Sequence, residues 1–269
     1  MSYTKYKLLK IRVHRGVAFT TIDNPPVNLI TPDLVMELEM FAREVAADDK
    51  VRVIVFDSAD PDFFLAHYDV GELNQLPDEV PPKSTELHEF NKINEAFRTM
   101  PKVSIAKIEG IARGGGSEFV LALDMRFGVI GKTIVGQPEV LVGIIPGGGG
   151  TQRLPRLMGR SRAMEVILSG NDLSAELAER YGYINRAFRP EELNSFVKAL
   201  AYRIASLPPE TIALAKRAVL TAEELPIVEG LLEETDLFNQ AVALPAAKQR
   251  MSLLLKMDGQ SREMERGSR

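Results

Sequence analysis

The sequence predicts an α/β fold, because short apolar runs typical of strands alternate with longer segments of helical periodicity. Residues 51–56 and 103–108 are β-branched, apolar runs of strand length. The apolar residues Leu34, Leu38 and Val45 recur at helical spacing ahead of the first run. Alternation of this kind predicts sheets that pack against a layer of helices.

The N-terminal part predicts a hairpin followed by a helix. Residues 7–13 and 16–22 carry alternating apolar side chains around the turn-prone Arg15-Gly16 pair, which predicts two strands joined by a tight turn. Thr31 stands where a helix N-cap is expected, and Pro32 suits the first helical position. We therefore expect a helix from Pro32 through the periodic apolar residues.

A loop and a change of pattern divide the rest of the chain. Residues 77–84 contain three prolines among polar residues, which predicts a mobile loop that could border a binding site. Helical periodicity dominates in residues 193–205, 210–220 and 227–242. We predict an α/β core in residues 1–200, a helical oligomerisation region in residues 201–256, and a disordered polar tail in residues 257–269.

Composition excludes several classes of function. The 269 residues carry 33 basic and 37 acidic side chains, mixed along the chain, so no basic patch predicts nucleic-acid or membrane-surface binding. Cysteine is absent, which excludes disulfides, thiolate metal ligands and cysteine nucleophiles. His14, His67 and His88 show no ligand spacing, so we expect no metal. Without a signal-peptide pattern or a spanning apolar run, a cytoplasmic location is expected.

Three glycine-rich segments carry the chemical information in the chain. They are residues 113–118, 136–139 and 145–155. Glycine lets the backbone approach a ligand closely, and a helix that starts after such a turn exposes unpaired N–H groups. Glu118 and Glu139 each lie beside one of these turns. The two carboxylates could therefore share one pocket and divide acid and base work between them.

These segments, in this order, resemble the crotonase (enoyl-CoA hydratase/isomerase) superfamily. The resemblance also includes residues 23–28, 63–69, 163–165 and 173–178, and it extends over most of the chain. It implies a spiral of strand-strand-helix units with a helical C-terminal region. It further implies an acyl-CoA substrate and a homotrimer or a dimer of trimers.

The resemblance assigns roles to individual residues. Gly115 and Tyr68 would present their backbone N–H groups as an oxyanion hole. Glu118 would act chiefly on the water molecule, and Glu139 chiefly on the α-proton. The positions implied for substrate or CoA binding are Phe64, Leu65, Ala66, His67, Gly114 and Gly148, with Gly148 also supporting the reacting water.

The sequence departs from the family pattern at two places. His67 stands where the family usually has glycine, with the bulky Tyr68 after it, which puts the shape of the oxyanion hole in question. Residues 253–258 do not match the C-terminal segment that contacts CoA of a neighbouring subunit in the family.

Thr151 is expected to cap the helix after the last glycine run, and Arg153 to make structural contacts.

We interpret the chain as an enoyl-CoA hydratase of fatty acid metabolism. It would add water to a trans-2-enoyl-CoA by acid–base catalysis, with no metal or other cofactor, since coenzyme A is part of the substrate. Two alternatives stay open. One is an enoyl-CoA isomerase or another crotonase-type acyl-CoA enzyme, although the second glutamate argues against the isomerase. The other is a non-catalytic acyl-CoA-binding protein in which His67 and Tyr68 spoil the oxyanion hole.

Overall fold

The computed structural model describes residues 3–257, 261, 262 and 266. The chain forms two compact units, Met1–Ser206 and Leu207–Arg269. Helix α8 (Pro190–Ala205) continues past residue 200, where we expected the core to end, and it belongs to the first unit.

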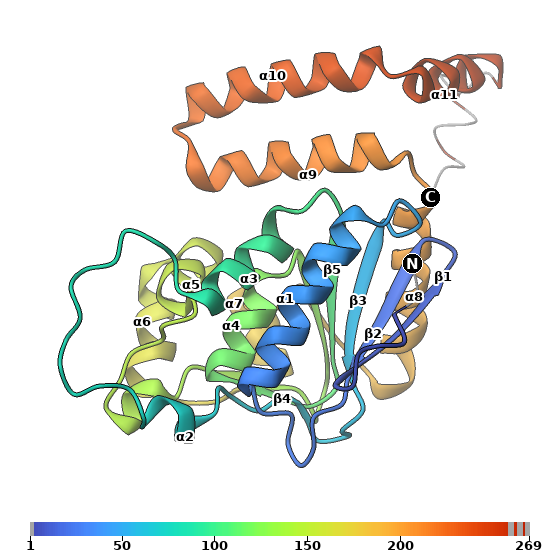
Figure 1. Ribbon diagram of the computed structural model, residues 1–269. Coiled ribbons are helices and arrows are strands. Elements are labelled where there is room, and N and C mark those ends of the chain that lie inside the picture. The colour runs from blue at the N-terminus through green and yellow to red at the C-terminus, as the bar shows by residue number, and fades with distance from the viewer. Residues whose placement is uncertain (1–2, 258–260, 263–265, 267–269) are drawn as a thin grey trace. The chain divides into compact units, whose positions relative to one another are not determined.

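The first unit contains two sheets (Figure 1). One has the strand order β1-β2-β3-β5-β7-β10, and the other has the order β4-β6-β8-β9. The strands of the larger sheet are β1 (Leu9–His14), β2 (Val17–Ile22), β3 (Val53–Ser58), β5 (Val103–Ile108), β7 (Met125–Val129) and β10 (Arg186–Phe188). Those of the smaller sheet are β4 (Phe63–Leu65), β6 (Ile111–Arg113), β8 (Ile134–Gly136) and β9 (Leu173–Ser174).

From β3 to β8, successive strands alternate between the two sheets. β3, β5 and β7 are parallel neighbours in the larger sheet, and β4, β6 and β8 are parallel neighbours in the smaller one. Each pair is followed by a helix: α3 (Glu89–Thr99) after β4, α4 (Gly114–Ala122) after β6, and α5 (Gly150–Met158) after β8. This repetition of strand, strand and helix confirms the predicted spiral and the α/β class.

The N-terminal predictions are also confirmed. β1 and β2 pair antiparallel from Leu9 opposite Ile22 to His14 opposite Val17, which is the expected hairpin. Helix α1 (Pro32–Ala47) begins after Thr31, whose side chain accepts a hydrogen bond from the Leu34 amide. A short polar side chain before a helix satisfies one of the free N–H groups of the first turn, so this start is local in origin.

The core lies around helix α4, whose residues are all buried. Phe56, Phe97 and Phe119 pack edge to face there, with ring centroids 5.2–5.7 Å apart. α4 contacts β4, β6 and β8 as well as α3 and α5. The helix is covered on all sides, which fixes its first turn inside the protein.

The proline-rich loop and α8 lie at the periphery of the first unit. Residues 77–84 are exposed and without regular structure, between α2 (Val70–Leu73) and α3, as expected for a loop (Figure 1). α8 packs against the larger sheet at β2, β3, β5, β7 and β10. The first unit also contains α6 (Arg160–Ser169), α7 (Ala175–Tyr181) and a short 3-10 helix, η1 (Glu139–Val142).

The second unit is helical. It consists of α9 (Pro209–Glu224), α10 (Ile227–Ala243) and α11 (Pro245–Lys256). The first two of these correspond to the predicted segments, whereas α11 was not predicted as a separate helix. Most of the tail predicted for residues 257–269 lies outside the described residues. Across the described part of the chain, no helix combines the length and apolarity needed to cross a bilayer.

Candidate active site

In the loop after β4, the backbone amide of Tyr68 points away from Ile30, whereas the adjacent His67 carbonyl and Asp69 amide bond to it. Ile30 N donates to His67 O at 2.9 Å, and Asp69 N donates to Ile30 O at 3.1 Å. Both of these groups therefore face Ile30. Because N–H groups alternate in direction along an extended segment, the intervening Tyr68 amide faces the opposite side.

That opposite side is the first turn of α4. Gly115 is the second residue of this helix, so its amide has no acceptor within the helix. A Cβ atom on Gly115 would lie 3.3 Å from Tyr68 N, so the two backbone segments are in direct contact. Within residues 3–257, neither the Tyr68 nor the Gly115 amide has a hydrogen-bond acceptor. The residues expected to form the oxyanion hole thus present two adjacent free donors.

The histidine at position 67 fits this loop without backbone strain. Among the described non-glycine residues only Arg15 and Asn28 have positive φ, so His67 occupies an ordinary backbone region. Its ring Nδ1 is 2.8 Å from Tyr68 O. His67 Cβ would lie 3.5 Å from a Cβ on Gly114, which places it beside the start of α4. A side chain here is therefore compatible with the geometry of the donor pair.

The three residues before His67 offer little side-chain surface to a ligand. Phe64 and Leu65 are fully buried, and Ala66 is nearly so. Phe64 and Leu65 belong to the hydrophobic core. Their assignment to CoA binding stays a prediction, and any contact from Phe64 or Leu65 would have to be made through the main chain.

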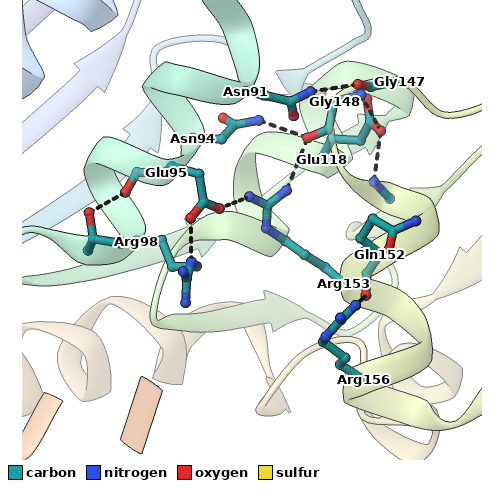
Figure 2. A network of polar contacts seen from close by, with 12 residues as sticks. Asn91, Asn94, Glu95, Arg98, Glu118, Gly147, Gly148, Gln152, Arg153 and Arg156 are labelled. Atoms are coloured by element: carbon teal, nitrogen blue, oxygen red, sulfur yellow. Dashed lines mark hydrogen bonds and ion pairs between the residues drawn. The ribbon is translucent and has the colours of Figure 1, made fainter. Parts of the chain in front are cut away.

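Glu118 projects from α4 onto the start of α5. Its Oε1 accepts hydrogen bonds from the amides of Gly148 at 2.7 Å and Gly150 at 2.8 Å, which leaves Oε2 for a water molecule (Figure 2). Burial raises the pKa of this carboxyl, and the amides of the loop oppose that rise. A Cβ on Gly148 would lie 2.5 Å from Glu118 Oε2, so any side chain at this position would displace the carboxylate.

The same contacts correct the prediction for Thr151. Helix α5 has Gly149 at its N-cap position, with no side-chain capping bond, and Thr151 lies within the first turn. The first helical amide, that of Gly150, is bonded instead by Glu118 from a different helix. A carboxylate at a helix N-terminus is also favoured by the helix dipole. The cap is therefore supplied by tertiary structure, which the local sequence could not show.

Glu139 opens the 3-10 helix η1 and is buried. Its Oε1 would lie 3.3 Å from a Cβ on Gly114, so the carboxyl faces the start of α4. Burial, with a further contribution from the nearby negative charge of Glu118, raises the pKa of Glu139 to about 7. Glu139 thus faces the first turn of α4, and Glu118, on the same helix, is close enough for its charge to act on Glu139. Their joint catalytic role stays a prediction.

A buried chain of polar side chains holds Glu139, and sequence reasoning did not identify it. The Gln137 amide satisfies both its nitrogen and its oxygen only when turned so that the nitrogen faces Glu139. In that orientation the nitrogen donates to the two carboxylate oxygens of Glu139 at 3.0 and 3.2 Å, and the oxygen accepts from Ser117 Oγ at 3.1 Å. Ser117 Oγ in turn bonds to the Tyr183 hydroxyl. Gln137 lies in a glycine-rich segment that we singled out, but nothing in the sequence indicated its distant partners.

Two other features lie outside this arrangement. A hollow of about 330 Å³ lies on the larger sheet beside α8, where Lys10, Lys107 and Lys198 are among its lining residues. It shares no residue with the candidate site.

Among the described residues, no group of three or more histidine, aspartate or glutamate side chains is placed to hold a metal ion.

Comparison with known proteins agrees with this geometry. The family described as enoyl-CoA hydratase/isomerase matches residues 12–255. The chain is 30% identical to the short-chain-enoyl-CoA hydratase of Clostridium acetobutylicum, covering 89% of this chain and 91% of that protein. It is also 30% identical to the crotonyl-CoA hydratase of Syntrophomonas wolfei, covering 93% and 96%.

A solved structure shows the same fold. The enoyl-CoA hydratase of Bacillus anthracis superposes with a TM-score of 0.85 at 26% identity, covering 94% of this chain and 97% of that one. The fold and the paired carboxyls beside free backbone donors define a crotonase-type protein. The chain belongs to the enoyl-CoA hydratase/isomerase family, and the resemblance seen in the sequence is confirmed.

Proposed function

We propose that this chain is an enoyl-CoA hydratase that adds water across the double bond of a trans-2-enoyl-CoA. The observation that carries the proposal is the grouping around α4 of two buried carboxyls, Glu118 and Glu139, which interact electrostatically, with two adjacent free backbone amides at the first turn of that helix. Family relatives named as hydratases support the same reaction. Both carboxyls are present, which favours hydration over a one-carboxylate isomerisation.

Each group has a separate task in this reaction. Glu118 accepts a proton from the water molecule as the water oxygen bonds to the β-carbon of the substrate. The thioester oxygen then carries the enolate charge, and the amides of Tyr68 and Gly115 stabilise it. Loss of one such donor typically costs about 2.7–4 kcal/mol of transition-state stabilisation. Glu139 delivers its proton to the α-carbon, which completes the addition.

The environments of the two carboxyls support this division. Burial raises the pKa of Glu118, and the two amides bonded to its Oε1 oppose that rise and favour the ionised form in which it acts as a base. Glu139 has a pKa raised to about 7, so it holds a proton for part of the time at neutral pH. The two groups interact, and a pH profile would therefore report apparent values that belong to the pair.

The direct test follows the loss of enoyl-thioester absorbance with crotonyl-CoA and with a longer-chain enoyl-CoA. Glu118→Gln and Glu139→Gln should each lower the rate by about 10²–10⁴-fold. Glu165→Gln is the matched control, because this glutamate is exposed and its side chain bonds only the Tyr181 hydroxyl among the described hydrogen bonds. Thermal stabilisation by an acyl-CoA without any turnover would instead identify a non-catalytic acyl-CoA-binding protein. Double-bond migration without hydration would identify an isomerase.

We also propose that the chain assembles as a homotrimer or a dimer of trimers, through its helical region. Helix α10 exposes Ile227, Val228, Leu232 and Phe238, each by more than 60%. Apolar side chains grouped on one helix favour burial against another copy. Sedimentation velocity of the wild type and of Leu232→Glu tests this: the wild type should sediment as an oligomer and the variant as smaller species. A monomeric wild type would refute it.

We propose that the chain acts in the cytoplasm, in fatty acid metabolism. The absence of cysteine is compatible with a reducing cytoplasm. Hydration of an enoyl-CoA fits a step in fatty acid metabolism. Cell fractionation with an antibody against the chain, and acyl-CoA profiles of cells that lack it, would test these two proposals.

A further inference from the structure

Helix α3 presents two different faces to the interior. Its buried apolar residues pack into the core, whereas a second face carries polar side chains at positions i, i+3, i+4 and i+7. This polar stripe of α3 comprises Asn91, Asn94, Glu95 and Arg98. Figure 2 shows three of its members directed toward the glycine loop and the start of α5.

The stripe holds the carbonyl groups of the glycine loop. Asn91 Nδ2 donates to Gly147 O at 2.9 Å, and Asn94 Nδ2 donates to Gly148 O at 3.1 Å. Arg153 of α5 also donates to Gly148 O, at 3.1 Å. Two consecutive peptide groups are thus fixed from one side by side chains (Figure 2).

The N–H side of the same loop meets Glu118. The peptide group that accepts from Asn91 carries the Gly148 amide, which donates to Glu118 Oε1. The next peptide group accepts from Asn94 and Arg153 through Gly148 O, and its N–H is that of Gly149, which also acts to lower the pKa of Glu118. A donor on a carbonyl oxygen polarises the peptide and strengthens its own N–H as a donor. Side chains on the far side of the loop therefore act on Glu118 through single peptide groups.

Arg153 is itself held by one contact on α3, in addition to its bond to Gly148 O. Its guanidinium forms an ion pair with Glu95, whose other oxygen accepts from Arg98 Nε at 2.8 Å. Asn94 and Arg153 are each largely buried. Because the Arg153 guanidinium is bound both to Gly148 O and to the Glu95 carboxylate, its position is fixed. The position of the glycine loop is fixed with it.

We propose that Asn91, Asn94 and Arg153 are positioning residues. They hold the glycine loop so that its amides orient the Glu118 carboxylate. This inference rests on the proposed hydratase function, in which Glu118 acts on the water molecule. It deepens that function by naming side chains on α3 and α5 that do not touch the substrate. Their contribution is made through the loop alone.

The charges around Glu118 determine the direction of the expected effect. Arg153 faces it from α5, Glu139 from η1, and the Tyr183 hydroxyl lies in the same buried region. Arg153 is the one positive charge among these three, and it lowers the pKa of Glu118. Removing it raises the pKa of Glu118, so a larger fraction is protonated and unable to accept a proton at mildly acidic pH. The acidic limb of the kcat profile should move to higher pH.

The test compares Arg153→Gln with Arg156→Gln. Arg156 is a matched control on the same helix, because its guanidinium bonds the carbonyl of Gln152 in its own helix. Arg153→Gln should lower kcat by about 10–100-fold, since small misplacements of a catalytic group have effects of this size. KM should change by less than about threefold, because no substrate contact is lost. Arg153→Lys should recover part of the rate and of the pH profile.

A second variant guards against misfolding of the first. Asn94→Leu removes the donor to Gly148 O, while Arg153 still bonds that carbonyl. The Asn94 Oδ1 atom is already buried without a hydrogen-bond partner, so the apolar replacement leaves no new unpaired group. Asn94→Leu should keep the thermal midpoint near that of the wild type and lower kcat. An unchanged kcat in a folded Arg153→Gln or Asn94→Leu protein would overturn the inference.

One measurement separates this inference from the proposed reaction. Infrared titration follows the carbonyl stretch of the protonated Glu118, assigned by its disappearance in Glu118→Gln. Its apparent pKa should be higher in Arg153→Gln than in Arg156→Gln, whether or not the wild type hydrates crotonyl-CoA. Equal values in the two variants would refute the positioning role. Absence of turnover in the wild type would refute only the hydratase proposal.

Discussion

Replacement of Glu139 by glutamine should stabilise the folded protein while it removes activity. In the folded state the pKa of this carboxyl is raised from its ordinary value of 4.5 to about 7 by burial and by Glu118. At about 1.36 kcal/mol per pKa unit, ionising Glu139 costs the folded state about 3 kcal/mol relative to the unfolded chain. The hydrogen bonds from Gln137 favour the ionised form and reduce this cost, so we expect about 1–3 kcal/mol.

The sign of the pH dependence follows from the raised pKa. The stabilising contribution of protonated Glu139 is fully present below about pH 4.5 and is lost as the pH rises through about 7. Glu139→Gln cannot ionise, so it escapes that loss. Its free energy of unfolding should exceed that of the wild type by about 1–3 kcal/mol at pH 8.5 and by much less at pH 5.

The assay is urea unfolding of both proteins at pH 5 and pH 8.5, at one fixed protein concentration because an oligomer would make stability concentration-dependent. Hydration of crotonyl-CoA is measured on the same samples and should fall by about 10²–10⁴-fold in the variant. The reasoning would be refuted if the two proteins lost stability equally between pH 5 and pH 8.5. Glu165→Gln controls for the removal of one surface charge.

Three further changes test the supports of the site and of the fold. Gly115→Ala places a Cβ 3.3 Å from Tyr68 N, so kcat/KM should fall by about 10–10³-fold with a small change in thermal midpoint, and an unchanged rate would contradict the role of the donor pair. Asn28→Ala removes side-chain bonds to Ser58 at the end of β3 and to Phe64 in β4, and chemical denaturation should show a loss of about 2–4 kcal/mol. Glu37→Ala removes a buried carboxylate that accepts three amides at the start of β1, so a loss of about 2–4 kcal/mol is expected, and a loss below about 0.5 kcal/mol would show that those amides are satisfied by water.

Local signals in the sequence were sufficient for many elements. The hairpin follows from alternation around Arg15-Gly16, and the start of α1 from a capping threonine before a proline. Strand β5 was predicted with its observed bounds because proline and charged residues delimit its apolar run. These features depend on residues within a few positions of one another, so periodicity and capping rules can identify them.

The pairing of the two sheets could not be read from local pattern. β3 and β5 are neighbours in the sheet, although 44 residues lie between Ser58 and Val103. Those residues form another strand and two helices. No periodicity indicates which strands belong to which sheet. The spiral was predicted through the resemblance to a family, and the strand alternation then confirmed it.

The candidate site divides in the same way. The sequence by itself determined which residue types were available: two glutamates, each beside a glycine-rich turn, and the glycines that allow close backbone approach. Tertiary structure alone decided that Glu118 caps α5, that Gln137 bonds Glu139, and that α3 fixes the glycine loop. Each of these contacts joins groups on separate elements, and their formation depends on burial and on the relative positions of packed helices, which no local pattern encodes.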